Sequence, residues 1–125
     1  MTISEVAKEY DITADTLRYY ERIGILPAIQ RSRSGIRNYS EADCRTISFV
    51  KCMRSAGVQI DALTEYMTLL REGDETREAR RNILVEQREQ LMGKIADMQR
   101  TLNILNKKIE IYEDKILKCE QEMRQ

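Results

Sequence analysis

Apolar residues recur three or four positions apart in four short segments of the first 72 residues, which is the spacing of one helix face. Thr13 and Ser40 stand directly before two of these segments, and both residue types favour helix N-termini. The pattern therefore predicts a small helical domain over residues 1–72. Its predicted helices cover residues 4–9, 14–23, about 41–55 and about 61–72.

The break between the first two predicted helices is short. Asp11, Ile12 and Thr13 separate them, and Gly24 and Pro27 end the second. Two short helices across a tight break are typical of a helix-turn-helix, in which the second helix enters the major groove of DNA. Helical domains that bind no DNA also contain this arrangement, so the break alone leaves both interpretations open.

Residues 25–40 have no helical period. A turn signal, Ser34-Gly35, lies between two short stretches that are compatible with β-structure. This predicts a small β-hairpin, or wing, after the helix-turn-helix. The predicted wing carries Arg31, Arg33, Arg37 and Tyr39.

The last third of the chain has a different pattern. From Leu91 onward apolar positions alternate in steps of four and three, which is a heptad repeat. One helix over 77–118 would be about 63 Å long, more than a compact domain of this size can cover. We therefore expect residues 73–125 to form a linker and a long coiled-coil helix that pairs with a second copy of the chain. The residues expected at the dimer interface are Leu84, Leu91, Ile95, Met98, Leu102, Leu105, Ile109, Tyr112 and Ile116.

Composition narrows the function classes. The chain has 125 residues and no His, so it lacks the commonest general base and the commonest metal ligand. The sequence also shows no Gly-rich phosphate loop and no pair of carboxylates in an apolar setting. We expect no enzyme, no cofactor and no metal. Without a long apolar run or a leader-like start, we expect a cytoplasmic protein that has no membrane partner.

A net charge of zero conceals a basic stretch. Residues 18–54 hold eight Lys and Arg against three Asp and Glu, and they span the predicted helix-turn-helix and wing. A basic patch at this place favours a polyanionic partner, although a solvated surface would show the same composition.

Together these features resemble the MerR family of bacterial transcription regulators. The strings ISEVAKEYDITADTLRYYERIGILP, RSRSGIRNYSEADC and SAGVQIDAL look like the winged helix-turn-helix of that family, over about residues 1–72 without a gap. The resemblance implies a mainly α fold with a winged helix-turn-helix followed by a long dimerisation helix. It also implies that family members pair through an antiparallel coiled coil, an orientation that heptads alone do not set.

The resemblance implies roles for individual residues. Arg18 and Tyr19 would lie in or near the major groove, and Tyr20 would anchor the helix or reach the DNA backbone. Arg37 and Tyr39 would grip phosphates from the first wing. The full set of expected DNA contacts is Thr16, Arg18, Tyr19, Tyr20, Arg33, Arg37, Tyr39 and Arg54.

The family mechanism is implied with the fold. A homodimer binds a pseudo-palindromic operator in promoter DNA that has an over-long spacer. It bends and untwists the duplex so that RNA polymerase, an indirect partner, can use both promoter elements. Because deforming DNA costs several kcal/mol, an effector that changes how the two DNA-reading helices are held can switch the promoter.

The three cysteines suggest how the switch works. Cys44 lies on an apolar helix face and Cys119 on the heptad repeat, without a Cys or His neighbour that could share a metal. Cys52 lies off the apolar face between Lys51 and Arg54, and nearby cations favour the reactive thiolate. The position is similar to that in a small MerR subgroup thought to respond to aldehydes and other electrophiles through one cysteine. Cys52 is therefore the expected sensor thiol.

Two alternatives remain open. The chain could be an architectural or protein-interaction coiled-coil protein that attaches to DNA without sequence preference, which would bind any duplex with a steep salt dependence. It could also be a MerR-type regulator whose effector is a small molecule that binds without a covalent bond.

Overall fold

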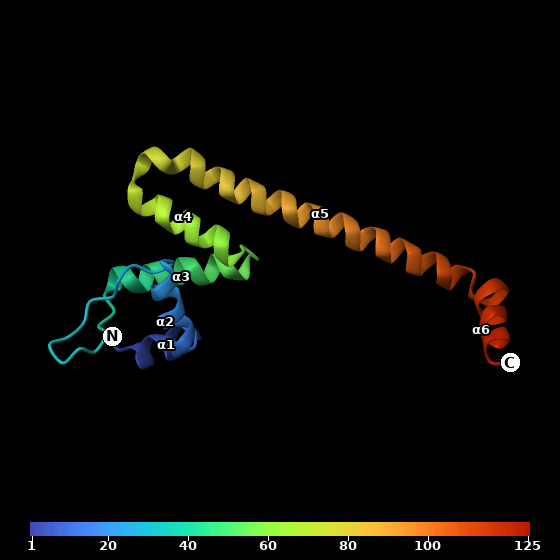
Figure 1. Ribbon diagram of the computed structural model, residues 1–125, viewed down its shortest axis with the longest axis horizontal. Helices are drawn as coiled ribbons and strands as arrows, with labels where there is room; N and C mark the ends of the chain where they lie inside the picture. Colours follow the sequence, from blue (N-terminus) through green and yellow to red (C-terminus); the bar gives the residue numbers. More distant parts are fainter. The chain divides into compact units, whose positions relative to one another are not determined.

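The structure, a computed structural model, describes residues 1–125 except for the side chain of residue 113. It is mainly helical, as predicted (Figure 1). The chain divides into two compact units, residues 1–87 and 88–125. The helices are α1 (Ile3–Tyr10), α2 (Ala14–Ile23), α3 (Glu41–Ser55), α4 (Ile60–Glu72), α5 (Arg77–Glu110) and α6 (Leu117–Met123).

Side-chain caps fix where the first three helices begin. The hydroxyl of Thr13 accepts a hydrogen bond from the backbone N–H of Thr16 at 3.1 Å, at the start of α2. At the start of α3, the Ser40 hydroxyl accepts from the backbone of Asp43, whose carboxylate accepts from the backbone N–H of Ser40. Thr2 and Glu5 form the same reciprocal pair at α1. The helix starts predicted at Thr13 and Ser40 are confirmed.

The core of the first unit joins α1, α2, α3 and α4. Its buried side chains include Val6, Leu17, Ile47 and Leu63, one from each helix. Leu63 and Met67 of α4 are buried, whereas Leu70, one turn further along the helix, is 41% exposed. The segment after α2 contributes buried apolar residues that the helical pattern did not indicate, namely Ile25, Leu26 and Ile29.

The wing is less regular than predicted. Instead of two strands, the described residues have a single antiparallel bridge between Arg31 and Arg37. A tight turn lies inside it, in which the N–H of Ser32 donates to the carbonyl of Ile36 at 2.7 Å and Gly35 has a φ of +82°. The Arg31 guanidinium also donates to the Gly35 carbonyl. A second backbone bond, from the N–H of Asn38 to the carbonyl of Gln30 at 2.8 Å, closes the other side of the bridge, so the wing is a short hairpin-like loop.

Contacts continue past the expected domain end at residue 72. Thr76 is buried, and its hydroxyl donates to the carbonyl of Leu69 at 2.7 Å. Ile83 on α5 is also buried. The side-chain oxygen of Gln87 accepts from the backbone N–H of Gln59 at 2.9 Å. The first turns of α5 thus belong to the same compact unit as α1 to α4.

A side chain of α4 reaches the end of α2. The Arg71 guanidinium donates to the carbonyl of Gly24, the residue that ends α2 in a left-handed conformation with a φ of +89°. Contacts between α3 and α4 hold the other side of α4. α4 is therefore connected to both helices.

The second unit contains most of α5 and then α6. One helix was predicted over 77–118, but α5 ends at Glu110, and a π-helical turn at Tyr112–Ile116 separates it from α6. The backbone leaves helical geometry at Ile111, where φ is −97° and ψ is 10°. Across the turn, the Tyr112 hydroxyl donates to Glu120 at 2.8 Å and ties α6 back to the turn.

The heptad residues lie on the surface of this chain. Exposure ranges from 37% at Leu84 to 71% at Met98 and Ile109, and only Ile116 of the predicted set is half-buried. No helix in the described part of the chain is long and apolar enough to cross a membrane.

We expect Ser40→Ala to lower the free energy of unfolding by about 1 kcal/mol, because the backbone N–H of Asp43 loses its cap. Urea denaturation measures this change. Ser34→Ala is the control, since Ser34 lies in the exposed wing loop and its loss should change stability by less than about 0.5 kcal/mol. Equal stability of the two variants would contradict the capping role.

Candidate nucleic-acid interface

The first two helices form a helix-turn-helix. Asp11 ends α1 in a left-handed conformation, with a φ of 52°, and the N–H of Ile12 donates to the carbonyl of Ala7. Leu17 is fully buried on the inner side of α2. With this residue inside, the opposite side of α2 presents Arg18, Tyr19 and Arg22 away from the core.

Arg18 and Tyr19 are held by short-range contacts on α2. The Arg18 guanidinium pairs with Asp15 at 2.9 Å, and both side chains are largely exposed. The Arg22 guanidinium lies 5.4 Å from the centre of the Tyr19 ring. Exposed ion pairs contribute little free energy, so Arg18 can leave Asp15 for a stronger acceptor at small cost.

The base of the wing is fixed to α2 by an ion pair. The Nε of Arg37 donates to Glu21 at 2.8 Å, and both side chains are about four-fifths buried. The second oxygen of Glu21 accepts from the backbone N–H of Ile29 at 3.3 Å. Glu21 therefore joins α2 to both ends of the wing loop, and sequence reasoning did not identify it because its role depends on a contact sixteen residues away.

Tyr39 lies in the core rather than on the surface. Its side chain is 2% exposed, and its hydroxyl has no hydrogen-bond partner among the described residues. Burial raises the pKa of this hydroxyl. The sequence-based expectation was that Tyr39 reaches a phosphate, whereas this placement keeps the hydroxyl away from solvent because the ring packs into the core.

A groove lies between the start of α2 and the end of α3, and we name it the α2–α3 groove. Its volume is about 400 Å³. It brings together three of the predicted DNA contacts, Thr16, Tyr20 and Arg54. The remaining lining residues are Asp11, Ile12, Thr13, Lys51 and Ser55.

Both cations of the α2–α3 groove are positioned by backbone carbonyls. The Lys51 ammonium donates to the carbonyl of Tyr10, and the Arg54 guanidinium donates to the carbonyl of Val58. The N-terminus of α2 opens beside them, and helix N-termini attract anions. Lys51 was not among the predicted contacts, although its spacing of three from Arg54 places the two cations on neighbouring turns of α3.

Cys52 is exposed near the end of α3, whereas Cys44 is buried, in agreement with the different roles predicted for them. Phe49 lies three residues before Cys52, and its ring stacks on Tyr66 of α4 with the ring centres 5.7 Å apart. Cys52 therefore lies one turn from the contact between α3 and α4. Cys119 is also exposed.

The described side chains contain no cluster of Cys, Asp and Glu that could hold a metal ion. The chain has no His at all.

Comparisons with known proteins agree with this geometry. Residues 1–70 match the model of the MerR HTH family regulatory proteins, and residues 44–108 match that of the MerR DNA-binding region. AdhR of Bacillus subtilis (strain 168), an HTH-type transcriptional regulator, is 55% identical over 92 residues. That match covers 74% of this chain and 66% of AdhR, just under two thirds of the relative's length.

Solved structures show the same architecture. A MerR family transcriptional regulator from Listeria monocytogenes superposes with a TM-score of 0.72 at 41% identity, covering 99% of this chain and 94% of that one. HiNmlR, a MerR family regulator that lacks the sensor domain and was crystallised with promoter DNA, gives a TM-score of 0.65 at 28% identity, covering 90% and 89%.

These relatives are regulators of transcription and not enzymes, as the absence of catalytic motifs predicted. The two family models together cover the helix-turn-helix, the wing and most of α5. The chain belongs to the MerR family of DNA-binding transcription regulators.

Proposed function

We propose that this regulator binds a pseudo-palindromic operator in double-stranded promoter DNA as a homodimer and distorts the duplex. The observation that supports this most directly is that one chain has both an exposed polar face on α2 and an exposed apolar series on α5. Each copy would read one half-site. RNA polymerase would then respond to the shape of the DNA rather than to a direct contact.

In this proposal three parts of the first unit touch DNA. Arg18 and Tyr19 on α2 face the major groove, where arginine can pair with guanine. The α2–α3 groove receives a phosphate, because Lys51 and Arg54 stand beside the N-terminus of α2. In the wing, Arg33 and Arg37 contact the phosphate backbone of DNA. Tyr39 is buried in the core and makes no such contact.

Arg18 and Arg37 should differ in what their loss does to DNA binding. We expect Arg18→Ala to cost about 1–3 kcal/mol on the operator and to relax preference at one base pair, because a base contact is lost. Arg37→Ala should weaken binding to all sequences alike and lower the salt slope by about one, because a phosphate contact is lost and the wing loses its bond to Glu21. Titrations at several salt concentrations measure both effects.

Arg77→Ala is the matched control, because Arg77 lies at the start of α5, outside the helix-turn-helix and the wing, where its exposed side chain pairs with Asp74. It should leave the salt slope unchanged. Wild-type affinity for Arg37→Ala would contradict the wing assignment. Equal affinity of the wild type for operator and random duplex would favour the architectural alternative instead.

Dimerisation is inferred from the exposed apolar series on α5. Leu91, Ile95, Met98, Leu102 and Leu105 are each about half exposed or more. A monomer rarely leaves so long an apolar row in water, and α5 alone offers nothing to cover it. A second copy of the same helix supplies a complementary surface.

We expect Leu102→Asp to dissociate the dimer, because the change places a charge inside the paired surface of both copies. Light scattering should then give the mass of one chain. Tight operator binding should be lost with it, since two half-sites no longer act together. Asn103→Asp adds the same charge one residue away, off the apolar series, and should remain dimeric; a wild-type protein that is monomeric at micromolar concentration would refute the proposal.

The proposed switch is covalent modification of Cys52 by aldehydes or other electrophiles, such as α,β-unsaturated aldehydes and quinones. The thiolate adds to the β-carbon of the conjugated carbonyl, and the carbon–carbon π bond breaks as the sulfur–carbon bond forms. The resulting enolate takes a proton from water, which gives the neutral thioether adduct. The adduct would press on the neighbouring α3–α4 contact at Phe49 and Tyr66. From there α4 leads to α5, and Gln59 at the start of α4 is already bonded to Gln87.

Serine substitutions separate the possible switches. With alkylation at Cys52, Cys52→Ser abolishes the effect of an electrophile on operator binding, and Cys119→Ser leaves it intact. With a disulfide between Cys52 and Cys119 of the partner subunit, both substitutions abolish the effect, and a non-reducing gel shows a crosslinked dimer. Operator footprinting with and without the electrophile provides the measurement.

If Cys52→Ser responds to electrophiles as the wild type does, both thiol switches are excluded. The effector is then a small molecule that binds without a covalent bond.

A further inference from the structure

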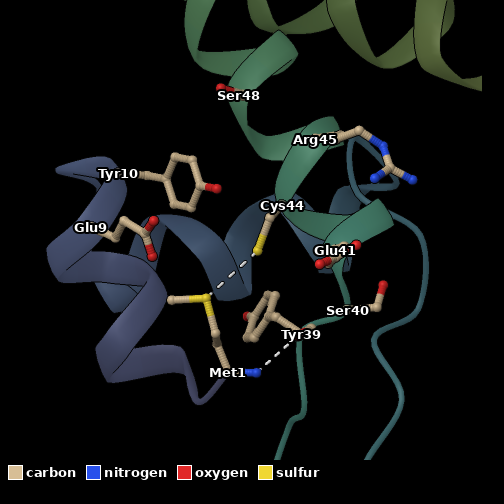
Figure 2. A pocket seen from close by; sticks show the side chains of 9 residues that line it. All are labelled: Met1, Glu9, Tyr10, Tyr39, Ser40, Glu41, Cys44, Arg45 and Ser48. Carbon is tan, nitrogen blue, oxygen red and sulfur yellow. Dashed lines mark hydrogen bonds between the residues drawn. The ribbon is translucent and has the colours of Figure 1, made fainter.

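A second hollow lies on another part of the first unit, between α1, the residues before α3, and α3 itself (Figure 2). We name it the α1–α3 pocket, and its volume is about 400 Å³. It shares no lining residue with the α2–α3 groove. Its lining residues are Met1, Glu9, Tyr10, Tyr39, Ser40, Glu41, Cys44, Arg45 and Ser48.

The inner wall of the pocket is aromatic and sulfur-containing. Tyr39 and Cys44 are buried and Tyr10 is half-buried, and Figure 2 shows all three turned toward the space between α1 and α3. The Cys44 thiol lies 3.9 Å from the sulfur of Met1. Such a wall favours a flat apolar molecule, because aromatic rings and polarisable sulfur pack well against a ring.

The Tyr39 hydroxyl is the unusual group behind this wall, and a ligand can reach it only when a side chain of the lining moves. It is buried and has no hydrogen-bond partner among the described residues. A buried polar group without a partner costs free energy, and native structures contain few of them. A tyrosine hydroxyl keeps its proton at neutral pH and can donate it, and burial raises the pKa of this one further. A ligand with an acceptor oxygen could therefore supply the hydrogen-bond partner that the Tyr39 hydroxyl lacks.

Charges at the rim do not favour an ionic ligand. Glu9 on α1 and Glu41 on α3 bring two carboxylates, and Arg45 brings a guanidinium. The amino group of Met1 also lies here, hydrogen-bonded to the Tyr39 carbonyl at 2.9 Å. Since opposite charges balance at the rim, an anion such as a DNA phosphate gains nothing over a neutral molecule.

We propose that the α1–α3 pocket binds a small neutral molecule with an aromatic body and one hydrogen-bond-accepting oxygen, such as an aryl ketone or an aryl alcohol. The ring packs against Tyr10 and Cys44, and the oxygen accepts from the Tyr39 hydroxyl. The unbranched side chain of Met1 moves aside to admit the ligand. This site is separate from Cys52 and needs no covalent step.

A ligand in this pocket would contact the residues that connect the wing to α3. Tyr39 and Ser40 connect the wing to α3, and the Ser40 hydroxyl caps that helix. The Tyr39 N–H also donates to the Met1 carbonyl at 2.7 Å. A ligand held at Tyr39 therefore stabilises the point where the wing leaves the helical core.

Acetophenone and ethylbenzene form a matched pair of probes, because they differ mainly in the acceptor oxygen and neither alkylates thiols. Calorimetric titration of the full chain should show one acetophenone per chain, bound about five- to tenfold more tightly than ethylbenzene. Tyr39→Phe should remove this preference and leave ethylbenzene binding unchanged. Tyr66→Phe, outside the pocket, is the control and should behave as the wild type.

A second readout uses the protein without a probe. Tyr39→Phe should keep or raise the melting temperature, because it removes an unsatisfied group, whereas a lower value would show that the hydroxyl has a partner and would overturn the proposal. Saturable binding that Tyr39→Phe does not change, or no binding at millimolar acetophenone, would overturn it as well. Cys52→Ser should bind the probe normally, so failure of the electrophile switch does not affect this test.

Discussion

The bond between Arg37 and Glu21 is the constraint on which the DNA-facing surface depends. One carboxylate on α2 holds the guanidinium at the end of the wing and the backbone N–H of Ile29 at its beginning. A loop with a single bridge has little stability of its own. Because both of its ends are bonded to α2, the wing keeps a fixed position beside this helix, which we propose reads DNA.

The two compact units differ in how much of their apolar surface is exposed to water. The first unit buries its apolar residues around Leu17, Ile47 and Leu63, while α5 leaves Leu102 and Met98 exposed. An apolar surface of this extent is rarely left in water, so the proposed association rests on the second unit and the proposed DNA contacts rest on the first. The same division explains why residues 73–87 fold with the first unit, although they continue into α5 without a break.

Local signals predicted the helix starts, because caps such as Thr13 and Ser40 act within four residues. Features that depend on distant contacts were missed. Ile25 is buried by tertiary packing in a segment without helical period, and Lys51 lines the α2–α3 groove only once α3 packs beside α2. The heptad repeat continues past Ile111, but the α-helical backbone is interrupted there. Apolar spacing indicates which residues face a partner and does not indicate where a helix ends.

The hydrogen bond between Arg71 and the Gly24 carbonyl couples the position of α4 to the C-terminal end of α2. Arg71 of α4 contacts the residue that caps the C-terminus of α2, and α4 also packs against α3. A small tilt of α4 would be transmitted to α2 as a torque at its C-terminal end. The N–H of Leu26, two residues after Gly24, donates to the carbonyl of Tyr20 at 3.1 Å. A displacement of α4 would therefore act on the end of α2 and on the start of the wing loop together.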